Sequence, residues 1–431
     1  MAGAVVAASG LYRGPVAALS GHYLFTDFAS GNIWKLDPDA VNPRASVTNI
    51  NGRLAPNART ISRIAAFGED AAGNLYLMDY GSGASGEVFR VATTSQRAVW
   101  NGGNAAAGAP GDGTSWNDAR NWTRGSLVDT AFVEHDEVVF AAGASPAVIN
   151  LGADRTASAI TFAGSHTLEG HTLRLMSGNV LVQDGAIAIV RSNLAAETAD
   201  HSIRKLGAGT LLVEGNAGQI AVKQGTLGGT GTVAHLTVCD EAVAAPGGSS
   251  ASAGILTVNQ SFTMHAGATL AIEIGGRSNA NPQNPQFDHV AIGGAAKLDG
   301  MLSIDFIDLG AGEFAPANGD AFAIFSAAGG ISGAFDHLDL PPLSPTLEWQ
   351  SVVRDAAYFL AVTPKLPGDY NANGTVDAAD YVVWRKTSGQ SGVRPAADGT
   401  GPTGAADGIV DELDYQLWQA NFGASMSGAW S

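Results

Sequence analysis

The amino-acid sequence predicts a mainly β protein that ends in a small α-helical module. Of its 431 residues, 56 are glycine and only 15% are charged, a composition that suits sheets with many tight turns. Short β-branched and aromatic runs alternate with turns rich in Gly, Asn, Asp and Ser, which is typical of strands. We expect partial β-propeller blades at 1–95, a β-solenoid or β-sandwich body at 96–363, a small α-helical EF-hand-like module at 364–424 and a tail at 425–431.

Charge, cysteine content and hydropathy exclude several classes of function. The formal net charge is −17, which disfavours nucleic-acid binding and favours cation binding. Cys239 is the only cysteine, so neither an intrachain disulfide nor a thiolate metal cluster can form. Apolar runs stay well short of 18 residues, so we expect no membrane span. The start makes a poor signal peptide, and we expect the chain to be an N-terminally truncated piece of a secreted or cell-surface protein.

The first region contains strand-like phrases separated by turns. "HYLFTDF", "GNIWKL" and "NLYLMDY" are such phrases, and "DAAGNLY" joins a turn to a strand as propeller blades do. The segments "LYRGPVAALSGHYLFTDFASGNIWKL" and "ISRIAAFGEDAAGNLYLMDY" resemble the last blades of the glucose/sorbosone dehydrogenase family. That resemblance implies a six-bladed propeller and pyrroloquinoline quinone, but it covers residues 1 to about 92 alone.

The resemblance also sets expectations for the quinone. It places Arg63 near a position that holds the quinone's carboxylates, whereas Ala29 stands where a lysine is expected. The early blades that carry the catalytic base are missing from the match. We therefore expect no quinone binding and no dehydrogenase activity from this chain, and we favour a plain surface position for Arg63.

The second region repeats a phrase in which Gly precedes an alternating strand. Examples are "GHTLRLM", "GTLLVEG", "GATLAIEIGG" and "GMLSIDF". In "TLAIEI", Leu270, Ile272 and Ile274 share one face of the strand. The irregular spacing of the repeats favours stacked β-coils with variable loops. The phrases "VWNGGNAAAGAPGDGTSWNDARNW" and "KLGAGTLLVEGN" resemble autotransporter-associated β-strand repeats, which implies a passenger-like architecture and leaves the ligand open.

Three groups of residues in this region suggest chemistry, and for each we favour a structural role. The two Asp-His neighbours, at 288–289 and 336–337, suit general base catalysis, but adjacent residues on a strand point to opposite faces. A polysaccharide lyase needs a carboxylate cluster with a nearby base, and the acidic residues of "DGMLSIDFIDLG" lack the base. Three tryptophans suit sugar stacking, although packing at the first coil is the favoured role. The residues of the last two groups are Asp299, Asp305, Asp308, Trp100, Trp116 and Trp122.

The third region contains an EF-hand-type calcium loop in "GDYNANGTVDAADYVVW". Oxygen-bearing residues recur at loop positions 1, 3, 5, 7, 9 and 12, glycine stands at position 6, and Asp replaces the usual Glu at 12. The predicted ligands are Asp369, Asn371, Asn373, the Thr375 carbonyl, Asp377 and Asp380. A helix should follow, with an apolar face at Tyr381, Val382 and Trp384.

A second loop follows in "ADGTGPTGAADGIVDELDYQLW". Its last positions match directly, whereas its first two match only if "GPTGAA" is an insertion within the loop. The predicted ligands are Asp398, Thr400, Asp407, the Ile409 carbonyl, Asp411 and Asp414. We expect two Ca²⁺ sites, the second weaker because the insertion must be ordered.

This duplicated loop–helix unit resembles a type I dockerin, which implies calcium-dependent docking onto a cohesin-like protein domain. The resemblance covers about 55 residues. It departs at loop positions 10 and 11, where the family often has hydroxyl residues and this chain has Ala378–Ala379 and Glu412–Leu413.

Three functions follow from these resemblances. The first is an extracellular, non-catalytic modular surface or adhesive protein with a dockerin-like docking module, whose partner is a cohesin-like domain or a cell-surface polysaccharide. The second is the carboxyl-terminal fragment of a quinone-dependent sugar dehydrogenase. The third is a carbohydrate-binding or polysaccharide-degrading component of an assembly.

Overall fold

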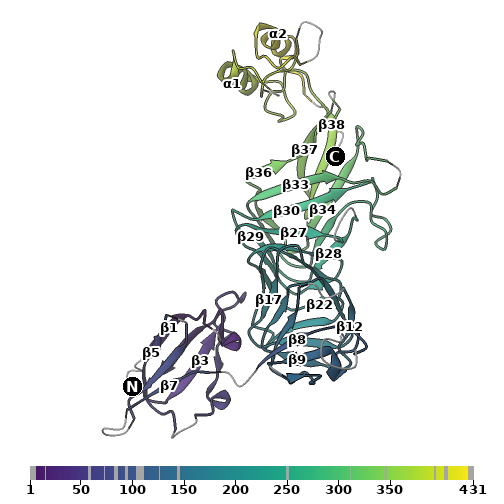
Figure 1. The fold of residues 1–431 in the computed structure, drawn as a ribbon. Coiled ribbons are helices and arrows are strands. Elements are labelled where there is room, and N and C mark those ends of the chain that lie inside the picture. The colour runs from purple at the N-terminus through teal and green to yellow at the C-terminus, as the bar shows by residue number, and fades with distance from the viewer. Residues whose placement is uncertain are drawn as a thin grey trace. The chain divides into compact units, whose positions relative to one another are not determined.

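The computed structural model confirms a mainly β chain (Figure 1). It describes residues 6–14, 16–56, 60–71, 73–81, 86–92, 96–102, 111–125, 127–142, 146–248, 252–310, 312–344, 347–392, 395–401 and 406–425. Among the stretches of the predicted regions that lie outside the described residues are 103–110 of the β body, 402–405 of the second loop and 426–431 of the tail. The chain divides into two compact units: Met1–Glu313 with Ile324–Asp339, and Phe314–Ala323 with Leu340–Ser431.

The first unit begins with two antiparallel sheets. The first sheet runs β1 (Val6–Leu11), β2 (Tyr23–Asp27), β3 (Asn32–Leu36) and β4 (Thr48–Asn49), and the second runs β5 (Ile64–Glu69), β6 (Leu75–Asp79) and β7 (Glu87–Arg90). Short 3₁₀ turns occupy Ala17–Leu19 and Asn51–Arg53. The four-stranded antiparallel sheet fits the predicted pattern of short strands separated by turns. The assignment to a propeller stays a prediction.

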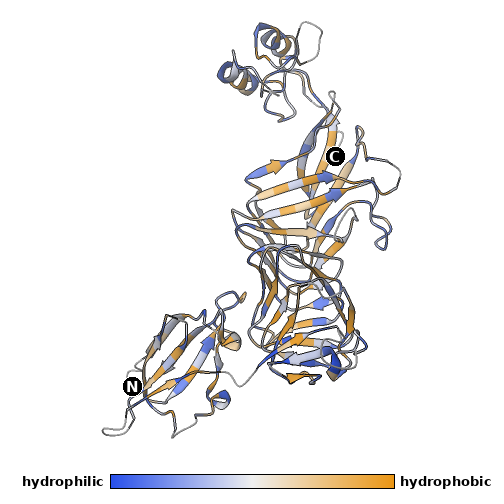
Figure 2. Cartoon of the chain, viewed as in Figure 1, coloured by the Kyte–Doolittle hydropathy of each residue, from blue (hydrophilic) through white to orange (hydrophobic). Residues whose placement is uncertain are grey.

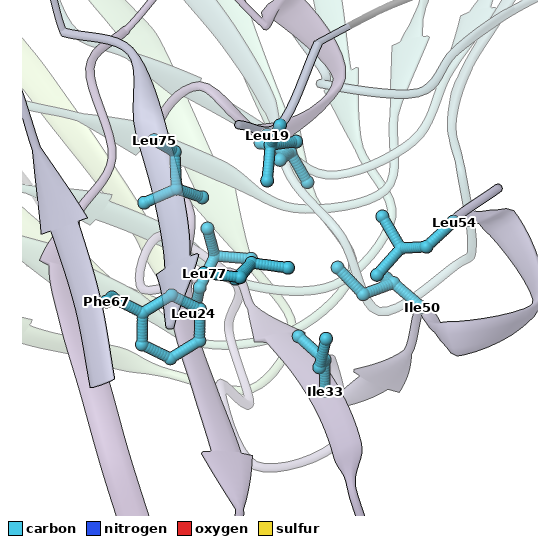
Figure 3. A pocket seen from close by; sticks show the side chains of 9 residues that line it. Leu19, Leu24, Ile33, Ile50, Leu54, Phe67, Leu75 and Leu77 are labelled. Carbon is cyan, nitrogen blue, oxygen red and sulfur yellow. The ribbon is translucent and has the colours of Figure 1, made fainter. Parts of the chain in front are cut away.

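Apolar side chains from both sheets meet in one small core. Leu24 and Ile33 from the first sheet point toward Leu75, Leu77 and Phe67 of the second around a small cavity (Figure 3). The residues lining this cavity are leucine, isoleucine, phenylalanine and valine, so they offer no side-chain nitrogen or oxygen. Arg63 lies away from this core, with an exposed side chain.

The rest of the first unit coils through three long sheets of mainly parallel strands (Figure 1). Successive strands belong to successive sheets, so each strand pairs with the strand three places later in the chain. The first sheet runs β10 (Leu127–Val128), β9 (Trp122–Arg124), β8 (Arg97–Trp100), β11 (Glu137–Phe140), β14 (Ile160–Phe162), β17 (Asn179–Val182), β20 (Ile203–Leu206), β23 (Ile220–Val222), β26 (Leu236–Val238), β29 (Phe262–Met264), β32 (Ala296–Leu298) and β35 (Ile331–Gly333).

The other two sheets are built in the same way. The second runs β12 (Val148–Asn150), β15 (His166–Glu169), β18 (Ile187–Val190), β21 (Thr210–Val213), β24 (Gly225–Gly229), β27 (Ala242–Pro246), β30 (Thr269–Ile274), β33 (Met301–Phe306) and β36 (His337–Asp339). The third runs β13 (Arg155–Ala157), β16 (Thr172–Leu175), β19 (Asn193–Ala196), β22 (Asn216–Ala217), β25 (Thr232–Val233), β28 (Ile255–Val258), β31 (His289–Ile292) and β34 (Ala321–Ala327). Figure 2 shows the hydrophobic colour concentrated along these strands.

Alternation of inward and outward side chains fixes the register of the coils. In β30, Leu270, Ile272 and Ile274 are buried, as the sequence predicted. They pair with Leu302, Ile304 and Phe306 of β33. A one-residue slip would expose this whole set, so the register is strongly specified. Gly300 lets the chain enter β33 at a φ of +68°, and a Cβ there would lie 2.3 Å from the Ala268 carbonyl oxygen.

One lysine interrupts the apolar interior. Lys205 aligns in register with Val180 and Val222, both fully buried, and is itself 0% exposed. Its Nζ donates to three backbone carbonyls, those of Leu206, Gly207 and Gln224. Burial lowers the pKa of Lys205 to about 8. The ammonium thus satisfies carbonyls at the corner between two sheets.

Aromatic residues close the first coil. Trp100, Trp116 and Trp122 are at most 1% exposed; Trp122 contacts the other two edge to face, and all three contact Phe140. The Trp122 Nε1 donates to the Trp116 carbonyl at 2.8 Å. Their burial excludes sugar stacking by these rings and confirms the packing role that the sequence favoured.

The second unit contains a hairpin and two short helices. The hairpin pairs β37 (Leu347–Arg354) with β38 (Ala357–Pro364), and the helices are α1 (Ala378–Thr387) and α2 (Glu412–Asn421). These are the α-helices of the described residues, so the expectation of very little helix before residue 364 is confirmed there. Neither helix is long and apolar enough to cross a membrane.

Candidate metal centre

The first predicted loop folds its backbone amides around Asp369. This residue is 3% exposed; its Oδ2 accepts a hydrogen bond from Gly374 N at 2.7 Å and its Oδ1 accepts one from Asn373 N at 3.2 Å. Gly374 has a φ of +82°, which glycine adopts without strain. The side-chain oxygens of Asn371 and Asn373 accept from Asn373 N and Thr375 N. The side-chain oxygens of this loop therefore accept hydrogen bonds from its own backbone amides.

Asp380 closes the loop and begins helix α1. It is fully buried; its Oδ1 accepts from Tyr370 N and Asn371 N, and its Oδ2 accepts from Asp377 N. Asp377 in turn accepts from Ala379 N at 2.7 Å, so the two carboxylates form a capping box. Loop position 12 is thereby tied to the start of the loop and to the first turn of the helix.

The second loop repeats these contacts around Asp398. Its Oδ2 accepts from Gly408 N at 2.7 Å and its Oδ1 accepts from Asp407 N at 3.1 Å, across the insertion that the sequence suggested. Gly408 has a φ of +84°, close to that of its counterpart in the first loop. The Asp407 Oδ1 accepts from Ile409 N. Asp398 therefore holds position 1, although residues 402–405 lie outside the described part of the chain.

Asp414 takes the place of Asp380 in this second loop. It is fully buried; its Oδ1 accepts from Gly399 N and Thr400 N, and its Oδ2 accepts from Asp411 N. Asp411 accepts from Leu413 N and completes a second capping box. The structure thus brings the predicted residues of each loop together in two copies of one arrangement.

The two halves hold each other through their tryptophans. The Trp384 Nε1 donates to the Asp411 carbonyl at 2.9 Å, and the Trp418 Nε1 donates to the Asp377 carbonyl at 2.8 Å. Each indole therefore fixes the capping residue of the opposite loop. This reciprocity joins the two halves.

The core of this unit is small, and one prediction about it is wrong. Trp384, Ala397 and Val410 form its buried cluster, packed against four partly buried side chains, those of Tyr370, Tyr381, Val383 and Tyr415, and Val376 is also buried. Val382, predicted to face inward, is 48% exposed. Asp380 and Trp384 are the buried residues of α1, and at 100° per residue Val383 lies near their face whereas Val382 lies on the opposite side of the helix. Figure 2 shows largely hydrophilic colour on α1 and α2.

Negative charge is crowded at the first loop. Burial, together with the nearby Asp380 carboxylate, raises the pKa of Asp369 although two amides oppose the shift. On the hairpin of the same unit, burial and the charge of Asp369 raise the pKa of Glu348 to about 7. A bound cation would relieve this repulsion.

The donor set fits a hard cation. Each loop offers carboxylate oxygens, side-chain amide or hydroxyl oxygens and one backbone carbonyl, which are the ligands that Ca²⁺ takes. In the described residues, no group of three or more acidic, histidine or cysteine side chains converges as a metal cluster. A calcium site in the first loop would therefore also need the amide and carbonyl oxygens of Asn371, Asn373 and Thr375.

Sequence reasoning missed the role of Tyr370. Its hydroxyl donates to the Asp414 carbonyl at 2.5 Å, which links the start of the first loop to the end of the second. The equivalent position in the second loop is Gly399, where a Cβ would lie 3.0 Å from the Tyr370 ring. The sequence did contain a signal for this contact, because the two loops have a tyrosine and a glycine at equivalent positions. A large side chain at Gly399 would collide with the Tyr370 ring.

The other sequence candidates do not assemble into a site. Asp288 is buried and accepts from Gly254 N and Glu273 N, whereas the neighbouring His289 contacts the Ser326 hydroxyl. Both residues of the second pair, Asp336 and His337, are exposed.

The three acidic residues considered for a lyase also act separately. Asp299 accepts from the amide of Gly300, Asp308 accepts from two loop amides, and Asp305 is exposed on β33. Asp299 and Asp308 therefore each bind nearby backbone amides, while Asp305 is exposed to solvent.

No protein-family model matches the chain, and no curated protein matches it either. The resemblances stated above therefore enter the functional argument as hypotheses.

Proposed function

We propose that this chain is a non-catalytic, extracellular modular protein in which a β-solenoid body is joined to a dockerin-like module that folds on calcium and docks onto a protein partner. The observation that carries the proposal is the repeated loop: the same carboxylate-to-amide contacts occur around Asp369 and Asp398, and the same capping box occurs at Asp380 and Asp414.

Calcium has a clear physical role in this proposal. A unit of about 55 residues buries too little apolar surface to be comfortably stable alone, and metal binding supplies folding free energy in such cases. The first site would use Asp369, Asn371, Asn373, the Thr375 carbonyl, Asp377 and Asp380. The second would use Asp398, Thr400, Asp407, the Ile409 carbonyl, Asp411 and Asp414. Calcium would neutralise the crowded carboxylates and hold each helix start against its loop.

Calorimetric calcium titration of the full chain tests the proposal. We expect two binding phases, with the second site weaker, at about 10⁻⁴ to 10⁻³ M, because its insertion costs ordering entropy. Asp380→Ala should remove the tighter phase, and Asp414→Ala should remove the weaker one. Asp305→Ala, which removes an exposed carboxylate on β33, is the matched control and should leave both phases unchanged.

Two results would contradict the proposal. The first is the absence of calcium binding at millimolar concentration. The second is a tighter phase that survives Asp380→Ala and disappears with Asp414→Ala, which would reverse the order of the sites. The docking step is tested separately, by capture of a cohesin-like domain in calcium and in chelator.

A further inference from the structure

An acidic turn of the N-terminal sheets lies in a basic socket on the coils. The turn is Asp37–Pro38–Asp39, which directly follows β3. The socket lies on the outward face of β20 and β23, where Arg204 alternates with the inward-facing Lys205. Both partners belong to the same compact unit.

Asp37 is the buried half of this contact. It is 0% exposed; its Oδ1 accepts from Arg204 Nη2 at 2.7 Å and its Oδ2 accepts from Ser202 N at 2.5 Å. Arg204 is itself 3% exposed and donates a further hydrogen bond to the Ser177 carbonyl at 2.7 Å. The ion pair therefore has its remaining hydrogen-bonding groups satisfied, the condition under which a buried pair is tolerated.

Asp39 adds a second pair of contacts. Its Oδ2 accepts from Arg204 Nε at 2.9 Å, and its Oδ1 accepts from Lys223 Nζ at 2.6 Å. Its backbone carbonyl accepts from the Ser202 hydroxyl at 2.7 Å. Two residues later, Val41 N donates to Gln219 Oε1 at 2.9 Å. The socket thus recognises both carboxylates and the backbone of the turn.

Gly21 lets the guanidinium lie flat against the backbone of the N-terminal sheets. Its carbonyl accepts from Arg204 Nη2 at 2.9 Å, and its φ is +79°. A Cβ at this position would lie 2.9 Å from the Arg204 Cζ. The sequence therefore has a glycine where a side chain would push Arg204 out of the contact.

A second cluster of ion pairs borders the socket. Lys35 and Arg53 both form ion pairs with Glu197, whose side chain is 5% exposed. Lys35 Nζ also donates to the Met176 carbonyl at 3.1 Å. Beside this cluster the rings of His22 and His201 lie 5.4 Å apart. Buried Lys35 and Glu197 are thus paired between the two sides, with the exposed Arg53 at the edge of the contact.

We propose that the outward face of β20 and β23 is a specific docking surface for an acidic Asp-Pro-Asp turn, and that residues 37–39 of the same chain occupy it. Charge complementarity carries this assignment: two carboxylates meet a buried guanidinium and an ammonium. The N-terminal sheets are then fastened to the coils as one rigid piece. This inference is independent of calcium binding.

Carbodiimide cross-linking of the full chain, followed by mass spectrometry, tests the contact directly. The reagent joins amines to carboxylates in contact, so we expect a Lys223–Asp39 cross-link within one chain. Hydrogen exchange should show protection of the Ser202 amide, which donates to Asp37. Asp37→Asn removes the fully buried carboxylate of the contact and leaves Arg204 with Asp39 as its counter-charge, and it should raise exchange at Ser202 by about 100-fold.

Asp79→Asn is the matched control, because Asp79 is also a buried carboxylate of the N-terminal sheets but accepts from amides of its own sheets. It should leave exchange at Ser202 and the cross-link unchanged. A wild-type chain with no Lys223–Asp39 cross-link and a fast Ser202 amide would overturn the proposal. Cross-links found solely between two copies would also overturn it, because the occupant would then be a second chain. Protection of β14 and β18 reports that a variant is folded.

Discussion

The coils between β11 and β35 and the two-loop helical module use opposite means to satisfy buried polar groups. In the coils, neighbouring parallel strands pair backbone with backbone, and apolar rows such as that of Leu270 and Leu302 fill the interior. In the module, side-chain carboxylates such as Asp369 and Asp380 bind the backbone amides, and the buried apolar residues are few. Stability that rests on apolar area survives changes of ion content, whereas the proposed calcium sites would make the stability of the module depend on a cation.

Calcium chelation should separate the two regions most strongly. In excess chelator we expect the amides of α1 and α2 to lose their protection from hydrogen exchange completely, because the buried carboxylates then lack their counter-ion. The strands from β14 to β33 should keep theirs. Hydrogen exchange on the full chain, with and without calcium, measures both regions in one sample. Equal protection of α1 in both conditions would show that the module folds without metal.

Leu270→Ala should damage the coils and spare the module. Leu270 is 0% exposed and faces the interior from β30, so its truncation leaves a cavity. We expect a loss of about 2–5 kcal/mol in the free energy of unfolding of the body, with calcium affinity unchanged. Denaturant unfolding gives the first quantity and calorimetry the second. Ala271→Ser, on the outward face of the same strand, should change stability by less than about 0.5 kcal/mol.

The sequence predicted local patterns in both regions but not the partners of the buried basic residues. The alternation in "TLAIEI" was enough to orient β30, because a two-residue period has only two possible faces. The sharp turns at Gly374 and Gly408 were also predictable, because glycine at position 6 marks the turn of such a loop, whereas the role of the loop residues as calcium ligands stays a prediction. The roles of Lys205 and Arg204 were not predictable, since a basic residue in an alternating strand does not reveal whether carbonyls at the nearby corner or distant carboxylates complete its hydrogen bonds. Contacts between segments more than 160 residues apart leave no local pattern.

His166 tests how the coils tolerate a buried titratable group. It is 2% exposed and packs against Phe140 at 5.1 Å, and within the described residues neither ring nitrogen has a hydrogen-bond partner. Burial lowers the pKa of His166 from its usual 6.5 to about 4. The unfolded chain therefore binds more protons between these values, and the stability of the body should fall as the pH drops from about 6.5 to about 4.

His166→Leu should remove that part of the pH dependence. The wild-type loss attributable to this residue is about 2–3 kcal/mol across the window, so the variant should gain on the wild type as the pH falls toward 4. Denaturant unfolding at several pH values measures the slope. His337→Leu, at an exposed histidine, serves as the comparison and should leave the slope unchanged. A wild-type slope that persists in His166→Leu would mean that the imidazole titrates normally in the folded coils.

Val382→Ser should have the smallest effect on stability, and it separates folding from docking in the module. Val382 is 48% exposed on α1, so its replacement removes little buried area and should change the calcium-bound stability by less than about 0.5 kcal/mol. Val383→Ser, one residue further and packed against the core, should cost about 1–2 kcal/mol because it places a hydroxyl among aromatic rings. If α1 presents Val382 to a partner, Val382→Ser should instead weaken capture of that partner while calcium binding is unchanged. Equal losses of stability from the two serine variants would show that the helix is rotated, with Val382 facing inward as its sequence pattern first suggested.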